Sequence, residues 1–115
     1  MSSGRRVCSA LDLIDDAGLI AAYEAAHAPG EVWPDVIRGI RASGVDQLEI
    51  WRTGDRLFMI AEVADDWPRA VTPELEAVDA RWQQAMEQFQ RRLPSANEGE
   101  KWVAMRRIFR LDAST

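Results

Sequence analysis

The feature that most constrains this chain is a pair of strand-like segments joined by a short turn. Residues Gln47–Arg52 alternate polar and apolar side chains with a period of two, which is strand periodicity. A turn at Thr53–Asp55 and a second strand at Arg56–Val63 complete a β-hairpin. Within this second strand, Leu57–Ala61 is apolar without alternation, so both of its faces need to be covered. The hairpin therefore requires a layer of protein on each side.

Helices and further strands flank this hairpin on both sides in the sequence. Strands are predicted at Val7–Ile14 and Trp102–Phe109, and helices at Ala17–Ala28, at Trp33–Ser43 and from Pro73 onward. The resulting order is strand, helix pair, strand, strand, helix, strand. That order is typical of an α+β ferredoxin-like fold, in which a four-stranded antiparallel sheet carries its helices on one face.

Capping residues support the predicted helix boundaries. Asp15 and Asp16 offer an N-cap for the first helix, and Thr72 offers one for the last. Pro34 falls in the first turn of the second helix, where a missing N–H costs little. Gly44 is expected to end that helix in a left-handed conformation.

The length of the chain, 115 residues, suits one domain that spans residues 1–115. Helices on one face would leave the other face of the sheet uncovered, although Phe58/Ile60 and Leu57/Met59 point to opposite faces. A second copy packed sheet to sheet is the simplest cover. The sequence therefore predicts a homodimer.

Charge and cysteine content narrow the partners and the compartment. The formal net charge is −5 and no basic stripe occurs, so nucleic acid is not an expected partner. One cysteine, Cys8, cannot form an internal disulfide, which fits a reducing compartment. No stretch is long and apolar enough to span a membrane, so a cytoplasmic protein is expected. One histidine and one cysteine cannot assemble a zinc site of the His/Cys type within one chain.

His27 is the only histidine and the only side chain whose ordinary pKa suits proton transfer near neutrality. It follows Tyr23 by four residues, so both side chains lie on one helix face and could grip neighbouring sugar hydroxyls. A structural alternative is equally consistent with spacing alone. A histidine in a last helical turn often only complements the helix dipole.

Five tryptophans are many for this length, and aromatic rings stack on the apolar faces of sugars. Trp82 falls in the apolar stripe of the late helix and is expected to be core or a ligand platform. Trp33 begins the second helix and could cover a pocket or hold the loop in place. Glu49, opposite in direction to Leu48 on its strand, could line a pocket or pair with an arginine.

These residues combine into a pattern that resembles the L-rhamnose mutarotase family. The pattern consists of Tyr23-Glu-Ala-Ala-His27, then Trp33-Pro34-Asp35, then Arg81-Trp82, and the resemblance runs over nearly the whole chain. It implies a dimeric ferredoxin-like barrel that interconverts the anomers of a free deoxyhexose without metal or cofactor. L-rhamnose and L-fucose are both candidate substrates.

Position by position, the resemblance assigns roles. It makes His27 the proton donor and Tyr23 a substrate contact, and Trp82 matches the first member of a sugar-binding tryptophan pair. Gln83 stands in place of the second member, and Leu48 stands where the family has another tyrosine. We also expect Trp33 and Gln83 to contact substrate. The partner base is open between Glu49 and water.

Two other interpretations share this fold. The chain could be a cofactor-free oxygenase or a haem-handling protein, in which His27 would be an axial ligand. It could also be a module that binds a sugar without converting it.

Overall fold

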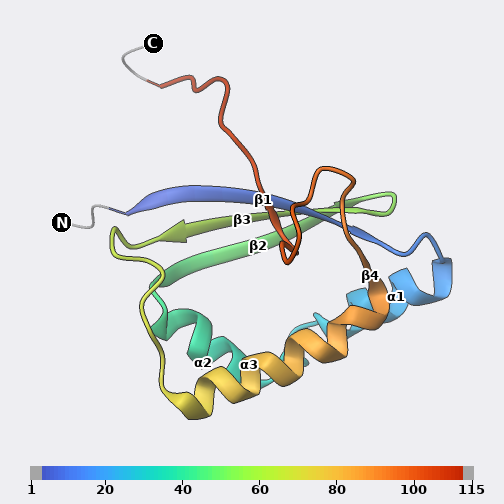
Figure 1. The fold of residues 1–115 in the computed structure, drawn as a ribbon, viewed down its shortest axis with the longest axis horizontal. Helices are drawn as coiled ribbons and strands as arrows, with labels where there is room; N and C mark the ends of the chain where they lie inside the picture. The colour runs from blue at the N-terminus through green and yellow to red at the C-terminus, as the bar shows by residue number, and fades with distance from the viewer. Residues whose placement is uncertain (1–3, 113–115) are drawn as a thin grey trace.

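A computed structural model describes residues 4–112 and places three helices against one face of an antiparallel sheet (Figure 1). The elements in order are β1 (Arg5–Leu13), α1 (Ala17–Ala26), α2 (Pro34–Ala42), β2 (Val45–Thr53), β3 (Arg56–Val63), α3 (Pro73–Met86), the 3-10 turn η1 (Glu87–Phe89), β4 (Gln90–Arg91) and β5 (Val103–Ala104).

The sheet has the strand order β2-β3-β1-β4, with every pair antiparallel. This is the order of a ferredoxin-like fold, in which the first and third strands are central. The registers of β1 on β3 and of β3 on β2 run nearly their full lengths. The α+β, ferredoxin-like prediction, with helices on one face, is therefore confirmed.

Short polar side chains set the helix boundaries as expected. The Asp16 carboxylate accepts a hydrogen bond from the Leu19 backbone N–H at 2.8 Å, which caps α1. The Thr72 hydroxyl accepts one from the Leu75 backbone N–H at 3.3 Å, which caps α3. Gly44 follows α2 with a φ of 109°, in the left-handed region that glycine tolerates. The helix α1 ends at Ala26, two residues earlier than predicted, and His27 is its C-cap.

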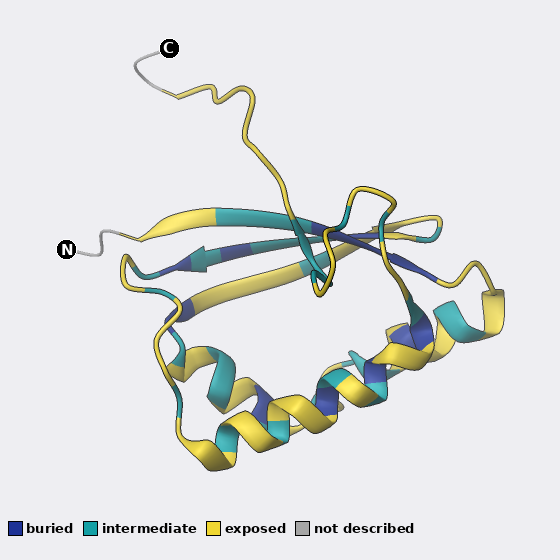
Figure 2. Ribbon diagram, in the orientation of Figure 1, coloured by how far each residue is buried: buried dark blue, intermediate teal, exposed yellow. Residues whose placement is uncertain are grey.

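The main core lies between the sheet and the helices (Figure 2). Its buried members come from β1, the helices, β3 and the 3-10 turn, namely Leu13, Tyr23, Val36, Leu57, Trp82, Met86 and Phe89. Trp82 and Met86 are four residues apart on α3, so one face of that helix is buried as its spacing predicts. The core thus fixes α1 and α3 beside the same part of the sheet.

The fourth strand differs from the prediction. We expected a strand at Trp102–Phe109, but only Val103–Ala104 pairs with β1, and the earlier piece Gln90–Arg91 also pairs with it. Continuing the β5 register would place Arg107 directly opposite Arg6, because Ser9 faces Ala104. Like charges in directly opposed positions destabilise a strand pair, which gives a physical reason for the early end.

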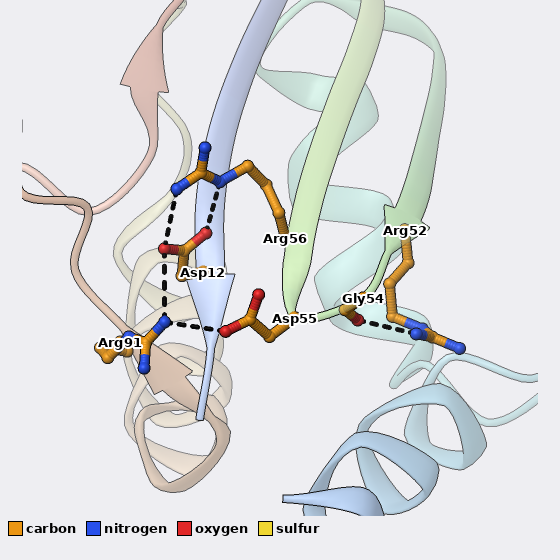
Figure 3. Close-up of polar contacts among 6 residues, drawn as sticks. All are labelled: Asp12, Arg52, Gly54, Asp55, Arg56 and Arg91. Carbon is orange, nitrogen blue, oxygen red and sulfur yellow. Dashed lines mark hydrogen bonds and ion pairs between the residues drawn. The ribbon is translucent and has the colours of Figure 1, made fainter. Parts of the chain in front are cut away.

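A network of ion pairs joins the strands at the hairpin end of the sheet (Figure 3). The buried Asp12 carboxylate accepts hydrogen bonds from Arg56 Nε at 2.7 Å and Nη2 at 3.1 Å. Arg91 lies 3.6 Å from the same carboxylate and 2.8 Å from that of Asp55. The hydrogen bond from Arg56 is the main cause that lowers the pKa of Asp12, against the opposing effect of burial.

Among residues 4–112, no helix has the length and apolar character needed to cross a membrane. Within the same residues, no group of three or more His, Cys, Asp or Glu side chains is arranged to hold a metal ion.

Candidate active site

The end of helix α1 places Tyr23 and His27 ring against ring, with centroids 4.3 Å apart. His27 Nδ1 lies 2.7 Å from the backbone carbonyl oxygen of Tyr23. A carbonyl oxygen can only accept, so Nδ1 carries the hydrogen and donates it. Nε2 is therefore the ring nitrogen left to exchange a proton with a ligand.

Aromatic side chains surround this pair. The Trp82 ring meets the His27 ring edge to face, with centroids 5.5 Å apart. Trp33 meets Trp82 in the same way at 5.1 Å, and Phe89 meets Tyr23 at 5.8 Å. Edge-to-face contacts of this kind hold ring orientations firmly. The predicted residues Tyr23, His27, Trp33 and Trp82 thus come together in one cluster.

A pocket of about 410 Å³ opens beside this cluster. Its lining comes from α1, β2 and β3, and consists of Tyr23, Glu24, His27, Ile50, Trp51, Arg52 and Leu57. This volume falls in the range of small-molecule sites. The pocket wall thus combines apolar side chains with side chains that can donate or accept protons.

Tyr23 is buried, and burial raises the pKa of its phenol to about 12. The hydrogen bond from the side chain of Gln90 acts in the opposite direction but is the smaller effect. Tyr23 therefore stays protonated near neutrality and acts through hydrogen bonds. Gln90 Oε1 is buried and has no hydrogen-bond partner within residues 4–112, so an acceptor is available beside the tyrosine.

An ion pair between Glu24 and Arg52 joins α1 to β2 in the pocket wall. Arg52 also donates to the carbonyl oxygen of Gly54 at 2.7 Å, as Figure 3 shows. Neither residue was predicted from the sequence as a site residue. The spacing of Glu24 and His27, three residues apart on one helix, was an available signal, whereas the contact with Arg52 depends on how α1 packs against the sheet.

Four sequence candidates are not among the residues that line this pocket: Trp33 and Trp82, which belong to the aromatic cluster, and Gln83 and Glu49. Gln83 donates to Asp79 at 3.3 Å and accepts from Lys101 Nζ at 3.0 Å. Glu49 accepts from the Trp51 indole at 3.1 Å and lines a separate cavity of about 310 Å³. A role for Gln83 in binding sugar stays a prediction, and Glu49 is not placed beside His27.

These features define the chain as a ferredoxin-like α+β protein with an aromatic pocket built around one proton-transfer group. Comparison with known proteins makes the assignment specific, because the sequence profile described as L-rhamnose mutarotase matches residues 6–111. The chain belongs to the L-rhamnose mutarotase family.

The chain is also similar to individual known proteins. The chain is 46% identical over 112 residues to the L-fucose mutarotase of Xanthomonas campestris pv. campestris, covering 95% of this chain and 90% of the relative. A protein of Dictyostelium discoideum is 30% identical over 110 residues, which cover 90% and 86% of the two chains. The crystal structure of an L-rhamnose mutarotase from Formosa agariphila matches with a TM-score of 0.67 at 18% identity, covering 94% of this chain and 99% of that one.

The family assignment confirms the predicted enzyme class. The chain is a sugar mutarotase, an isomerase that interconverts the anomers of a deoxyhexose. The family match favours this interpretation over the oxygenase, haem-handling and sugar-sensing alternatives.

Proposed function

We propose that this enzyme interconverts the α and β anomers of free L-fucose or L-rhamnose in the pocket beside His27. The observation that carries the proposal is the hydrogen bond from His27 Nδ1 to the Tyr23 carbonyl oxygen, which leaves Nε2 for the sugar. This bond fixes the ring at the end of α1, where it meets Trp82. A ring held in this way can meet a bound pyranose without first losing rotational freedom.

The reaction needs one proton donor and one proton acceptor. In our proposal the His27 imidazolium donates the proton on Nε2 to the ring oxygen, while a base removes the proton of the anomeric hydroxyl. The bond from C1 to the ring oxygen breaks as the C1 carbonyl forms. Rotation about C1–C2 and closure then give the other anomer, with both protons returned. One acid/base group of this kind typically contributes about 10²–10⁴-fold.

Glu24 is our candidate for the partner base. It is the only carboxylate among the residues that line the pocket, and it precedes His27 by one helical turn. Its ion pair with Arg52 holds the carboxylate at the pocket wall. Glu49, named earlier for this role, lines a different cavity. A base at position 24 would place both proton-transfer groups on the same side of the pocket.

The remaining cluster residues orient the sugar and the imidazole. We assign to Tyr23 and Gln90 the recognition of a sugar hydroxyl, because the phenol stays protonated and Gln90 Oε1 is an open acceptor. Trp82 is buried against His27 and serves to position its ring, and Trp33 contacts Trp82 in turn.

Saturation-transfer NMR of anomeric protons tests the proposal directly. Wild-type protein should speed anomer exchange of L-fucose or L-rhamnose above the buffer rate, and His27→Ala should abolish the increase. We expect L-fucose to be the better substrate, because the 46% identical relative is an L-fucose mutarotase. If neither sugar exchanges faster with wild-type protein than in buffer, the proposed function is wrong.

We also propose that the enzyme is a cytoplasmic homodimer whose two sheets pack face to face. The sheet face opposite the helices carries Trp51, which is 60% exposed, together with Phe58 and Ile60. A second copy would remove this apolar surface from water. Sedimentation at micromolar concentration tests the assembly, and a monomer there would contradict it.

A further inference from the structure

Arg91 is the last residue of β4 and lies between two carboxylates at the hairpin end of the sheet (Figure 3). Its Nη2 donates to the Asp55 carboxylate at 2.8 Å and lies 3.6 Å from that of Asp12. Arg91 therefore joins three segments of the chain, namely β4, the end of β1 and the turn between β2 and β3. It has no part in the chemistry proposed for the sugar site.

The residues just before Arg91 contact Tyr23 at two points. The Phe89 ring meets the Tyr23 ring edge to face, and the side chain of Gln90 donates a hydrogen bond to the phenol. Tyr23 in turn holds the imidazole of His27 through its carbonyl oxygen. The position of residues 89–91 therefore affects the pair that carries the proposed proton donor.

Strand β4 gives this segment few backbone attachments. In the described part of the chain, two residue pairs join β4 to β1. One more backbone hydrogen bond, from the Ile14 N–H to the Phe89 carbonyl oxygen, lies just before the strand. Residues 92–102 then leave the sheet edge. Because a segment with few attachments can open locally, the side-chain contacts of Arg91 supply an additional attachment where the chain departs.

Asp55 connects the same ion pair to the part of the pocket wall that β2 provides. It belongs to the β2–β3 turn, in which the neighbouring Gly54 carbonyl oxygen accepts a hydrogen bond from Arg52 at 2.7 Å (Figure 3). Arg52 lines the pocket and pairs with Glu24, the proposed base. The contact of Arg91 with Asp55 thus links the residues that support the proposed donor to those that support the proposed base.

Removing Arg91 would not leave a buried charge unpaired. The buried Asp12 carboxylate keeps both of its hydrogen bonds from Arg56, at 2.7 and 3.1 Å. The side chain of Arg91 is half exposed, and ion pairs of exposed side chains contribute little to stability. The ion pairs of Arg91 are therefore better suited to fixing local geometry than to stabilising the fold.

We infer that Arg91 is a positioning residue of the sugar site, which holds β4 against the β2–β3 turn and so aligns the proposed proton donor with the proposed base. Arg91 acts through Gln90 and Tyr23 toward the donor, and through the turn and Arg52 toward the base. The inference rests on the proposed function of the pocket. A displacement of about 1 Å between reacting groups can cost about 10²-fold in rate.

Anomer-exchange kinetics with three variants test the inference. Arg91→Ala should lower kcat by about ten-fold or more and change KM by less than about three-fold, because alignment matters most in the transition state. Arg91→Lys keeps a positive charge near Asp55 and should recover about half of the wild-type kcat or more. The matched control, Arg69→Ala, removes an ion pair of the same length with Asp66, in the loop after β3, and should leave kcat unchanged.

Tyrosine labelled with carbon-13 at Cζ gives a readout that does not require activity. Tyr23 is the only tyrosine, so the labelled protein has one such NMR resonance. Arg91→Ala should shift this resonance in the same direction as Gln90→Leu, which removes the hydrogen bond to the phenol directly. Arg69→Ala should leave the resonance in place.

Asp55→Asn guards against an Arg91→Ala chain that fails to fold. This variant keeps the arginine and weakens only its contact with the turn. It should lower kcat in the same direction as Arg91→Ala, with the helical circular dichroism of the wild-type protein.

Three results would overturn the inference: folded Arg91→Ala and Asp55→Asn proteins with wild-type kcat, an Arg91→Lys protein no more active than Arg91→Ala, or a Tyr23 resonance that Arg91→Ala does not shift. Failure of the proposed function looks different. Wild-type protein would then be inactive on both sugars, whereas the Tyr23 resonance would still report whether Arg91 holds Gln90 in place.

Discussion

The imidazole of His27 is anchored to the backbone of Tyr23, one helical turn earlier, by a hydrogen bond of 2.7 Å from Nδ1 to the carbonyl oxygen. The same two residues also place their rings 4.3 Å apart. One residue pair thus fixes both the tautomer and the orientation of the proton-transfer group. Because Nδ1 donates to this carbonyl oxygen, Nε2 is the ring nitrogen that can exchange a proton with a ligand.

Replacing His27 by glutamine should lower kcat/KM for anomer exchange by about 10²–10³-fold, because an amide cannot exchange a proton near neutrality. Exchange rates from saturation-transfer NMR measure the loss. Gln84→Ala, at an exposed position of α3, is the control and should leave the rate unchanged. A His27→Gln enzyme that keeps more than a tenth of the wild-type rate would exclude His27 as the proton donor.

Replacing Glu24 by glutamine should lower kcat by about ten-fold or more with a smaller change in KM, because the base acts on the anomeric hydroxyl in the transition state. The control is Glu31→Gln, an exposed carboxylate in the loop after α1. Equal rates in the Glu24 and Glu31 variants would assign the role of base to water.

Tyr23 makes stability fall at high pH. Its pKa is about 12 in the folded protein and about 10 when unfolded, so between these values only the unfolded chain gives up the proton. The free energy of unfolding should therefore decrease by up to about 1.4 kcal/mol per pH unit from pH 10 to 12. Denaturant titrations measure the slope, and Tyr23→Phe should remove this contribution. Tyr23 is the only tyrosine, so phenolate absorbance reports on it alone.

Asp12 has the opposite dependence on pH. Its pKa is lowered in the folded protein, chiefly by the hydrogen bond from Arg56, so its stabilisation is present above the unfolded pKa of about 3.9 and is lost as pH falls below it. At neutral pH, Asp12→Asn should cost roughly 1.5–3 kcal/mol, the usual loss for a buried, charge-assisted hydrogen bond. Asp46→Asn is the exposed control and should stay within about 0.5 kcal/mol. Equal midpoints in urea for the two variants would show that the network of Asp12 contributes nothing.

Local patterns were sufficient to predict the hairpin and the helix starts. The period-two alternation in β2 and the capping side chains of Asp16 and Thr72 depend only on residues close together in the sequence. The structure contains both the strand and the two capping hydrogen bonds. The last strand was not predictable in this way. Its apolar residues at Ile108 and Phe109 fit a strand pattern, but the β1 register would place Arg107 opposite Arg6 just before them.

The site was predictable to a similar degree. His27 follows Tyr23 by four residues, so the spacing alone predicted that their side chains lie on one helix face. Trp82 was recognised through the family pattern, and its contact with His27 became visible only in the structure. Arg52 contacts Glu24, and Gln90 contacts Tyr23, from strands that are far from α1 in the sequence. No local sequence pattern predicts these two contacts.

The interrupted fourth strand makes this fold tolerant of added sequence at one place. Asp12 pairs with Arg91, and Ala10, two positions away along β1, pairs with Val103. The eleven residues 92–102 therefore leave the sheet edge and return to it, where a continuous strand would need one. Each piece of the edge is held by its own hydrogen bonds to β1. The exposed turn near Gly99 is therefore a suitable point at which to insert a peptide tag or a reporter domain, or to open new chain termini. Such changes would leave the register on both sides in place.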